Sequence, residues 1–229
     1  MNPAVLSQAG IFFVILLCSL ALHEFAHAWV ADKRGDPLPR AQGRVTLDPL
    51  AHLDPLGSFL IPGAMILLPI LTGGSLPMAL IGWGKPVQVS LPNSKTRRLD
   101  DILITLAGPG MNLLIALVSS IVAGVALGLS SSSTEALERI FLPVILINIM
   151  LAVFNLIPVP PLDGSRVLFH MIHMKEETYA RLASFGWIIL LILINIPPVR
   201  MLFGYALVFA RLPFLLLIHF IAGLLQHQS

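Results

Sequence analysis

The chain has 229 residues, of which 56% are hydrophobic and only 11% are charged. A soluble domain carries about 25% charged residues, so this composition predicts an integral membrane protein. The formal net charge is only +2 and the basic residues are scattered between apolar runs, which argues against a nucleic-acid partner. The single cysteine, Cys18, cannot form an internal disulfide, and we expect it to act as a small buried hydrophobe.

The first apolar run covers residues 5–31, and no Lys or Arg precedes Lys33. It therefore lacks the basic start of a secretory signal peptide, and we expect the helix to be retained. Its second half contains His23, Glu24 and His27 in the pattern HExxH. On a helix the two histidines share one face and can hold one metal ion, with Glu24 beside them to take a proton from a metal-bound water. Buried polar packing is the alternative, but ionisable groups inside a bilayer favour a functional role.

Further apolar runs follow at about 57–83, 102–129, 140–157, 185–196 and 201–225. Most reach the roughly 20 residues that a membrane helix needs, whereas 185–196 is short and would need its flanks. The run at 57–83 contains several prolines and glycines that can interrupt a helix, so it either crosses the membrane or re-enters on the same side. The runs predict an all-α integral membrane bundle of five to six hydrophobic segments.

The distribution of charge distinguishes these two topologies. If 57–83 is re-entrant and the other runs cross, most of the 14 Lys and Arg residues share one side of the membrane. If 57–83 crosses, the basic residues divide almost evenly. The positive-inside rule therefore favours an N-terminus outside and an active site towards the cytoplasmic face.

A third metal ligand is expected, because catalytic zinc usually has three protein ligands and an open fourth position. The best candidate is Asp163, in the segment 155–164 that reads NLIPVPPLDG. Its prolines end the fourth run and leave irregular backbone near the membrane, which is tolerated only where it lines protein or a cavity. In isolation the segment would be an ordinary helix-ending turn. Asp48, His52 and Asp54 are interpreted as residues that cap or hydrogen-bond a loop.

Three motifs in order resemble the site-2 proteases, which are intramembrane zinc metalloproteases. They are HExxH at 23–27, GPGMN at 108–112 and NxxPxxPLDG at 155–164, and the resemblance covers residues 20–166. The segments 43–57 and 82–89 are also similar to the short prokaryotic branch of this family.

The resemblance implies a three-helix catalytic core and one zinc ion per chain. The ion would be held by His23, His27 and Asp163, with Glu24 as the general base. Asn155 and Asn112 are candidates to stabilise the oxyanion or to support the ligands, and interhelical hydrogen bonding is the alternative for both.

The substrate must be unwound before cleavage, because a helix hides its carbonyls in its own hydrogen bonds. The segments 44–47 and 86–91 have short β-like character and could hold an extended peptide by strand addition, or they could be ordinary loops.

The sequence thus predicts a single polytopic protease domain over 1–229, with a catalytic core at about 5–166 and C-terminal helices at about 183–225. Its expected partners are a transmembrane protein or peptide substrate and the bilayer of a prokaryotic cell, with no nucleic acid. A prenyl-protein-processing type of protease would need a downstream glutamate in a helix, but the later glutamates are all expected in loops. The remaining alternative is a non-proteolytic membrane protein for metal binding, transport or substrate binding.

Overall fold

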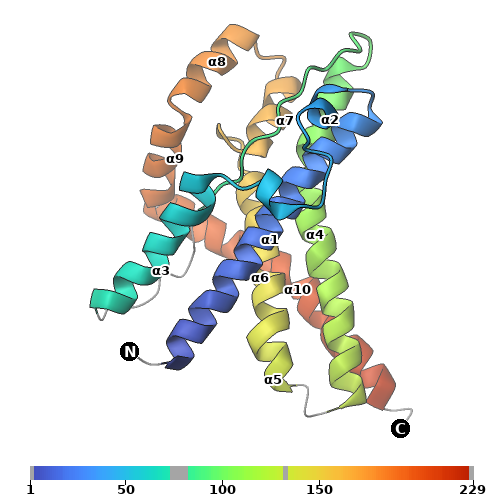
Figure 1. Cartoon of the computed structure of the whole chain (residues 1–229), viewed down its shortest axis with the longest axis vertical. Coiled ribbons are helices and arrows are strands. Elements are labelled where there is room, and N and C mark those ends of the chain that lie inside the picture. The colour runs from blue at the N-terminus through green and yellow to red at the C-terminus, as the bar shows by residue number, and fades with distance from the viewer. Residues whose placement is uncertain (1–2, 73–81, 131–133, 227–229) are drawn as a thin grey trace. The chain divides into compact units, whose positions relative to one another are not determined.

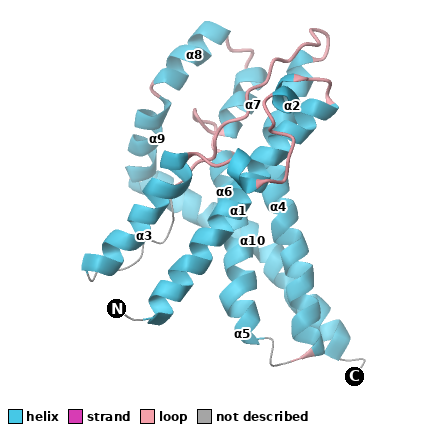
Figure 2. Ribbon diagram, in the orientation of Figure 1, coloured by secondary structure: helices cyan, strands magenta, loops and turns pink. Residues whose placement is uncertain are grey.

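The structure is a computed structural model that describes residues 3–72, 82–130 and 134–226. Within these residues the chain is helical or irregular, with no strand (Figure 2). The predicted all-α class is therefore confirmed. The chain divides into two compact units, Met1–Ser90 and Leu91–Ser229, and each is described by itself.

The first unit is built on the long helix α1, Pro3–Lys33, which contains the first apolar run (Figure 1). Cys18 on this helix is exposed, so the expectation that it is buried is wrong. The chain leaves this helix through Gly35, whose positive φ of 85° suits a residue without a side chain. The short helix α2, Leu38–Ala41, then packs on α1, where Arg40 donates to both carboxylate oxygens of Asp32 at 2.7 Å. The remaining helical segments of this unit are η1 (Pro49–Ala51), η2 (Pro55–Leu60) and α3 (Ile61–Thr72).

Two aspartates begin the segments that follow α2. Asp48 accepts a hydrogen bond from the Leu50 backbone at the start of η1, and Asp54 accepts from the backbones of Leu56 and Gly57 at the start of η2. The side-chain oxygens thereby satisfy N–H groups that a helix start leaves without partners. The prediction that these aspartates cap turns is confirmed.

The segments with predicted β-like character, 44–47 and 86–91, form no strand. The nearest feature is an isolated antiparallel bridge between Leu53 and Gly84. Residues 82–90, which we call the strap, are extended and irregular, and they are tied to the rest of the first unit by hydrogen bonds described below.

The second unit contains the helices α4 (Arg97–Leu129), α5 (Thr134–Ala136), η4 (Leu137–Phe141), α6 (Leu142–Asn155), α7 (Asp163–Met171), α8 (Glu176–Ser184), α9 (Gly186–Asn195) and α10 (Pro197–Gln226). The expectation that the later glutamates lie in loops is wrong, because the helical segments α5, η4 and α8 contain Glu135, Glu138, Glu176 and Glu177. Helix α4 packs along both α6 and α10, with Ala116, Ile145 and Ile218 in their common core. Gly124 and Gly128 let α10 come close, because a Cβ at either position would lie within 3.0 Å of an α10 side chain.

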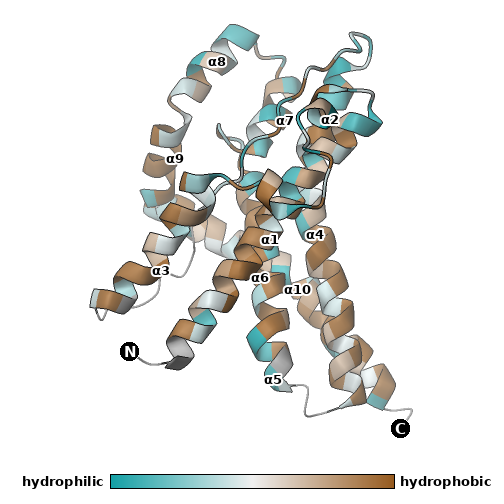
Figure 3. Ribbon diagram, viewed as in Figure 1, coloured by the Kyte–Doolittle hydropathy of each residue, from teal (hydrophilic) through white to brown (hydrophobic). Residues whose placement is uncertain are grey.

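Four helical segments are long and apolar enough to span a bilayer: Leu6–Lys33, Arg97–Leu129, Leu137–Asn155 and Pro197–Gln226. The pair α8 and α9, bent by 63°, would be a fifth if it forms one span. Hydropathy changes sharply between these two, from the largely polar α8 to the largely apolar α9 (Figure 3). The chain is thus a multi-pass integral membrane protein.

The run predicted at 57–83 is only partly described. Its first part forms η2 and α3, and the apolar helical stretch Pro55–Pro69 is shorter than a span. Residues 73–81 lie outside the described residues, so the choice between a crossing and a re-entrant segment stays a prediction.

Candidate metal centre

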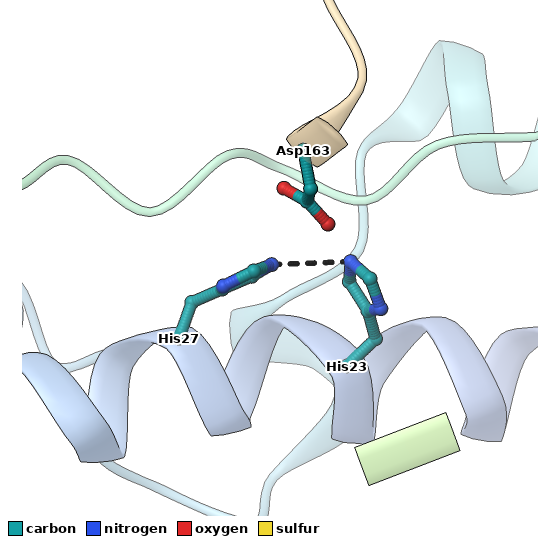
Figure 4. Close-up of side chains that lie close together, drawn as sticks. All are labelled: His23, His27 and Asp163. Atoms are coloured by element: carbon teal, nitrogen blue, oxygen red, sulfur yellow. Dashed lines mark hydrogen bonds between the residues drawn. The ribbon is translucent and has the colours of Figure 1, made fainter. Parts of the chain in front are cut away.

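The two histidines of the HExxH motif lie on one face of α1, as their spacing predicts. Both side chains are buried, and their Nε2 atoms are 3.1 Å apart (Figure 4). Two ligands of one tetrahedral zinc ion, each 2.0–2.1 Å from the metal, would be about 3.3 Å apart. The His23–His27 pair therefore has the donor type and the spacing that zinc requires.

Glu24 is also buried and is covered by the strap at Gly84. A Cβ at Gly84 would lie 2.6 Å from Cγ of Glu24, closer than real Cβ atoms approach a neighbour, and 3.1 Å from its Oε1. A residue with a Cβ at this position would force Glu24 or the strap to shift, because the Gly84 backbone lies directly against the Glu24 side chain. The segment 82–89 was noticed in the sequence for its family resemblance, but the contact of Gly84 with Glu24 was not predicted.

The strap is held in place at several points. The Trp83 backbone donates to Gly57 O at 3.2 Å, and Ser58 Oγ donates to Trp83 O at 2.8 Å. One residue beyond Gly84, the Lys85 backbone donates to His52 O at 2.7 Å.

The end of the strap is anchored by Asp36, a buried carboxylate just after α1. It accepts from the backbone and the hydroxyl of Ser90 at 2.5 and 2.6 Å. Hydrogen bonds on both sides of Gly84 thus fix the backbone that covers Glu24.

His52 and Arg44 support the loop on which the strap rests. His52 is fully buried, and its Nε2 donates to Thr46 O at 2.8 Å, since a carbonyl can only accept. Arg44 is also buried and donates to the carbonyl oxygens of Ala51 and Lys85. The interpretation of His52 as a residue that organises the loop is confirmed.

Asp163, the predicted third ligand, is the first residue of α7 in the second unit and is half buried. Figure 4 draws it with the two histidines. Leu162, just before it, has extended backbone, and Gly164, just after it, packs against the end of α6. A Cβ at Gly164 would come well within 3.0 Å of the Leu156 carbonyl oxygen. The Asp-Gly pair therefore allows α7 to start immediately beside α6.

The two asparagines singled out in the sequence make hydrogen bonds within the second unit. Asn112 on α4 is fully buried and donates to Asn148 Oδ1 on α6 at 2.9 Å, while Asn148 donates to Val144 O at 2.8 Å. Asn155 donates to Leu151 O of its own helix at 2.9 Å. Sequence reasoning missed Asn148, although an isolated amide in the apolar run 140–157 could have signalled a polar partner across the helices.

A chain with several membrane helices and an HExxH pair at zinc spacing inside one of them has the characteristics of a membrane metallopeptidase. The model of Peptidase family M50 matches residues 120–197. The chain is 33% identical over 197 residues to a Bacillus subtilis protein named as a zinc metalloprotease, YwhC, covering 84% of this chain and 83% of that protein.

Two mycobacterial relatives named as the zinc metalloprotease Rip2 are also similar. The Mycolicibacterium smegmatis protein is 31% identical over 202 residues, and the Mycobacterium tuberculosis H37Rv protein is 33% identical over 198 residues. Each alignment covers 84% of this chain and 70% of the relative. No solved structure matches the chain.

The chain belongs to peptidase family M50, the site-2 protease family. It is therefore a zinc metallopeptidase of the membrane, which the sequence predicted, and its cofactor is zinc. The alternative of a non-proteolytic metal transporter or scaffold loses its support.

Proposed function

We propose that this protein hydrolyses peptide bonds in or near transmembrane segments of membrane proteins. The observation that carries the proposal is the His23–His27 pair, whose Nε2 atoms are 3.1 Å apart within an apolar helix long enough to span the bilayer. A zinc site at this place in the membrane would act on peptide bonds that belong to transmembrane helices of other proteins.

We propose that His23, His27 and Asp163 hold the zinc ion. Two imidazoles and one carboxylate are a common donor set for catalytic zinc, and they leave a fourth position for a water or the substrate. Support for Asp163 comes from its place at the end of the motif NxxPxxPLDG and from the short, packed turn that fixes its backbone.

When bound, zinc polarises the substrate carbonyl and lowers the pKa of water to about 7. Glu24 accepts the proton of the attacking water and then donates it to the leaving amine. Its burial under the strap keeps the carboxylate in one place and away from bulk solvent. The carboxylate is thereby positioned to transfer the same proton twice.

Asn155 and Asn112 have different proposed roles. Asn155 lies at the C-terminal end of α6, and one hydrogen of its Nδ2 is used by Leu151 O. The amide carries a second hydrogen that can donate to the developing oxyanion. Asn112 instead supports the core through its bond to Asn148.

The strap is the proposed docking edge for the unwound substrate. Among the described residues, Val87, Gln88 and Val89 lie in no helix or strand, and their backbones make no hydrogen bond to another part of the chain. Such an edge can accept an extended peptide as an added strand, close to Gly84 and Glu24. If residues 57–83 re-enter the membrane on the same side, most basic residues share one side, and this distribution supports our proposal of an active site facing the cytoplasm.

The proposed third ligand is tested with Asp163→Asn in purified protein reconstituted in lipid vesicles with tagged single-span substrates. An amide is a far weaker zinc ligand than a carboxylate, so we expect zinc to be lost and cleavage to fall at least about a hundredfold. Asp48→Asn is the matched control, since Asp48 caps a turn. Full zinc content and full cleavage in Asp163→Asn would exclude this aspartate as a ligand.

Gly84→Ala is expected to reduce cleavage about 10–100-fold while the protein keeps its zinc. The added methyl group must displace Glu24, and a displacement of about 1 Å in a catalytic group can cost a hundredfold. Initial rates and metal content of the same preparations measure this. Gly63→Ala is the control, because nothing lies within 4 Å of a Cβ at Gly63. Equal rates in both variants would show that the strap does not constrain Glu24.

A further inference from the structure

The short helix α7 carries Asp163 at its first residue and a group of polar contacts further along. The contacts join α7 to its neighbours α4 and α8 within the second unit. We call the residues that make them the Asp101 cluster: Asp101, Ser165, Arg166, His170, Glu176 and Tyr179. The proposed chemistry gives none of them a role.

Asp101 is the centre of this cluster. Its side chain is 6% exposed, and its Oδ2 accepts a hydrogen bond from His170 Nε2 at 2.6 Å. A carboxylate can only accept, so Nε2 carries the proton. Arg166 Nη1 lies 3.7 Å from the same oxygen. One buried oxygen on α4 therefore holds α7 at two successive turns.

Helix α8 contacts α7 through Arg166 and Ser165. The Arg166 guanidinium lies over the ring of Tyr179, 4.7 Å from its centroid, and the Tyr179 hydroxyl is 3.0 Å from Ser165 Oγ. Ser165 Oγ in turn donates to Leu162 O at 2.6 Å. The carbonyl at the end of this series belongs to the residue immediately before the proposed zinc ligand.

The arrangement fixes the rotation of α7 about its own axis. A helix of nine residues is marginal by itself, so its orientation depends on such tertiary contacts. Positions 163, 166 and 170 follow the i, i+3, i+7 spacing of one helix face. When one carboxylate holds both Arg166 and His170, the direction in which the Asp163 side chain points from α7 is fixed as well.

We propose that Asp101 and His170 are positioning residues for the metal site, which act by orienting Asp163. The inference rests on the proposed function, because it takes Asp163 as a zinc ligand. Apolar side chains could hold α7 against α4 at a lower cost of desolvation, so the buried, hydrogen-bonded side chain of Asp101 favours a role in orienting α7 over a role in packing alone.

The test compares His170→Leu, His170→Gln and Asp101→Asn in the full-length protein purified in detergent. Zinc affinity is measured by competition with a chromogenic chelator, and the visible spectrum of the cobalt-substituted protein reports on ligand geometry. His219→Leu is the matched control, since His219 is exposed and its Nδ1 bonds to a carbonyl of its own helix α10. Circular dichroism and gel filtration verify the fold of each variant.

We expect His170→Leu and Asp101→Asn to bind zinc about 10–100-fold more weakly and to shift the cobalt bands. His170→Gln, whose amide can donate at nearly the same place, should retain most of the affinity. The asparagine in Asp101→Asn has nearly the shape of the native aspartate. If His170→Leu does not fold, the zinc affinity of Asp101→Asn tests the positioning role. Unchanged zinc affinity in the folded variants, or equal losses in His170→Leu and His170→Gln, would overturn the proposal.

Asp163→Asn separates this inference from the function on which it rests. If Asp163→Asn weakens zinc binding while the Asp101 and His170 variants do not, the ligand stands and the positioning role is wrong. If Asp163→Asn leaves zinc binding intact, the assigned ligand set itself is wrong, and the positioning role falls with it.

Discussion

Glu24→Gln is expected to abolish detectable cleavage while the protein keeps its full complement of zinc. A glutamine has nearly the size of the glutamate and should fit beneath Gly84, but it cannot accept a proton from water. Positioned general bases contribute about a hundredfold to ten-thousandfold, so the loss should be about a thousandfold or more. Rates on a reconstituted single-span substrate and metal analysis of the same sample measure the two expectations.

Glu135→Gln is a suitable control for this variant. Glu135 lies at the exposed start of α5 and forms an exposed ion pair with Arg139 at 3.2 Å, which contributes little to stability. If Glu24→Gln cleaved at the rate of this control, the general base would have to be another group. If it lost its zinc, the defect would lie in the metal site rather than in proton transfer.

Gly164→Ala is expected to weaken zinc binding about 10–100-fold, with a comparable loss of cleavage. The new Cβ would overlap the Leu156 carbonyl, and main-chain atoms cannot move aside as a flexible side chain can. The start of α7 must therefore shift away from α6, and Asp163 shifts with it. Titration with a competing chelator measures the affinity.

The control is Gly110→Ala, because a Cβ at Gly110 of α4 meets nothing within 4 Å. In a helix this change should be neutral or slightly stabilising, since alanine favours helix more than glycine does. The same zinc affinity in Gly164→Ala and Gly110→Ala would show that the turn tolerates a shift without disturbing the metal site.

The membrane helices and the histidine pair could be predicted because both depend on spacing along one helix. A run of about 20 apolar residues predicts a span, and an i, i+4 pair on that span must share a face. The capping roles of Asp48 and Asp54 could be predicted for the same reason, since each side chain bonds to the backbone of residues directly after it. Local rules of this kind need no knowledge of the rest of the fold.

The contacts between segments distant in sequence could not be predicted. Gly84 is 60 positions from Glu24, and nothing in its own neighbourhood distinguishes it from a turn glycine. Likewise Asp101 and His170 are 69 positions apart, and the sequence around either residue does not indicate the other. The α8–α9 pair shows the same limit, because hydropathy marks the apolar part but not the 63° bend.

The position of the HExxH motif along α1 determines how deep in the membrane the water for hydrolysis must reach. Lys33, the last residue of the helix, lies ten positions after His23, which corresponds to about 15 Å along the helix axis. The histidines thus lie up to half the thickness of a roughly 30 Å hydrocarbon layer from the nearest charged end of their helix. Hydrolysis at the proposed zinc site would require a hydrated passage from that end, and a substrate helix aligned with α1 would then be cut within about three turns of its own polar flank.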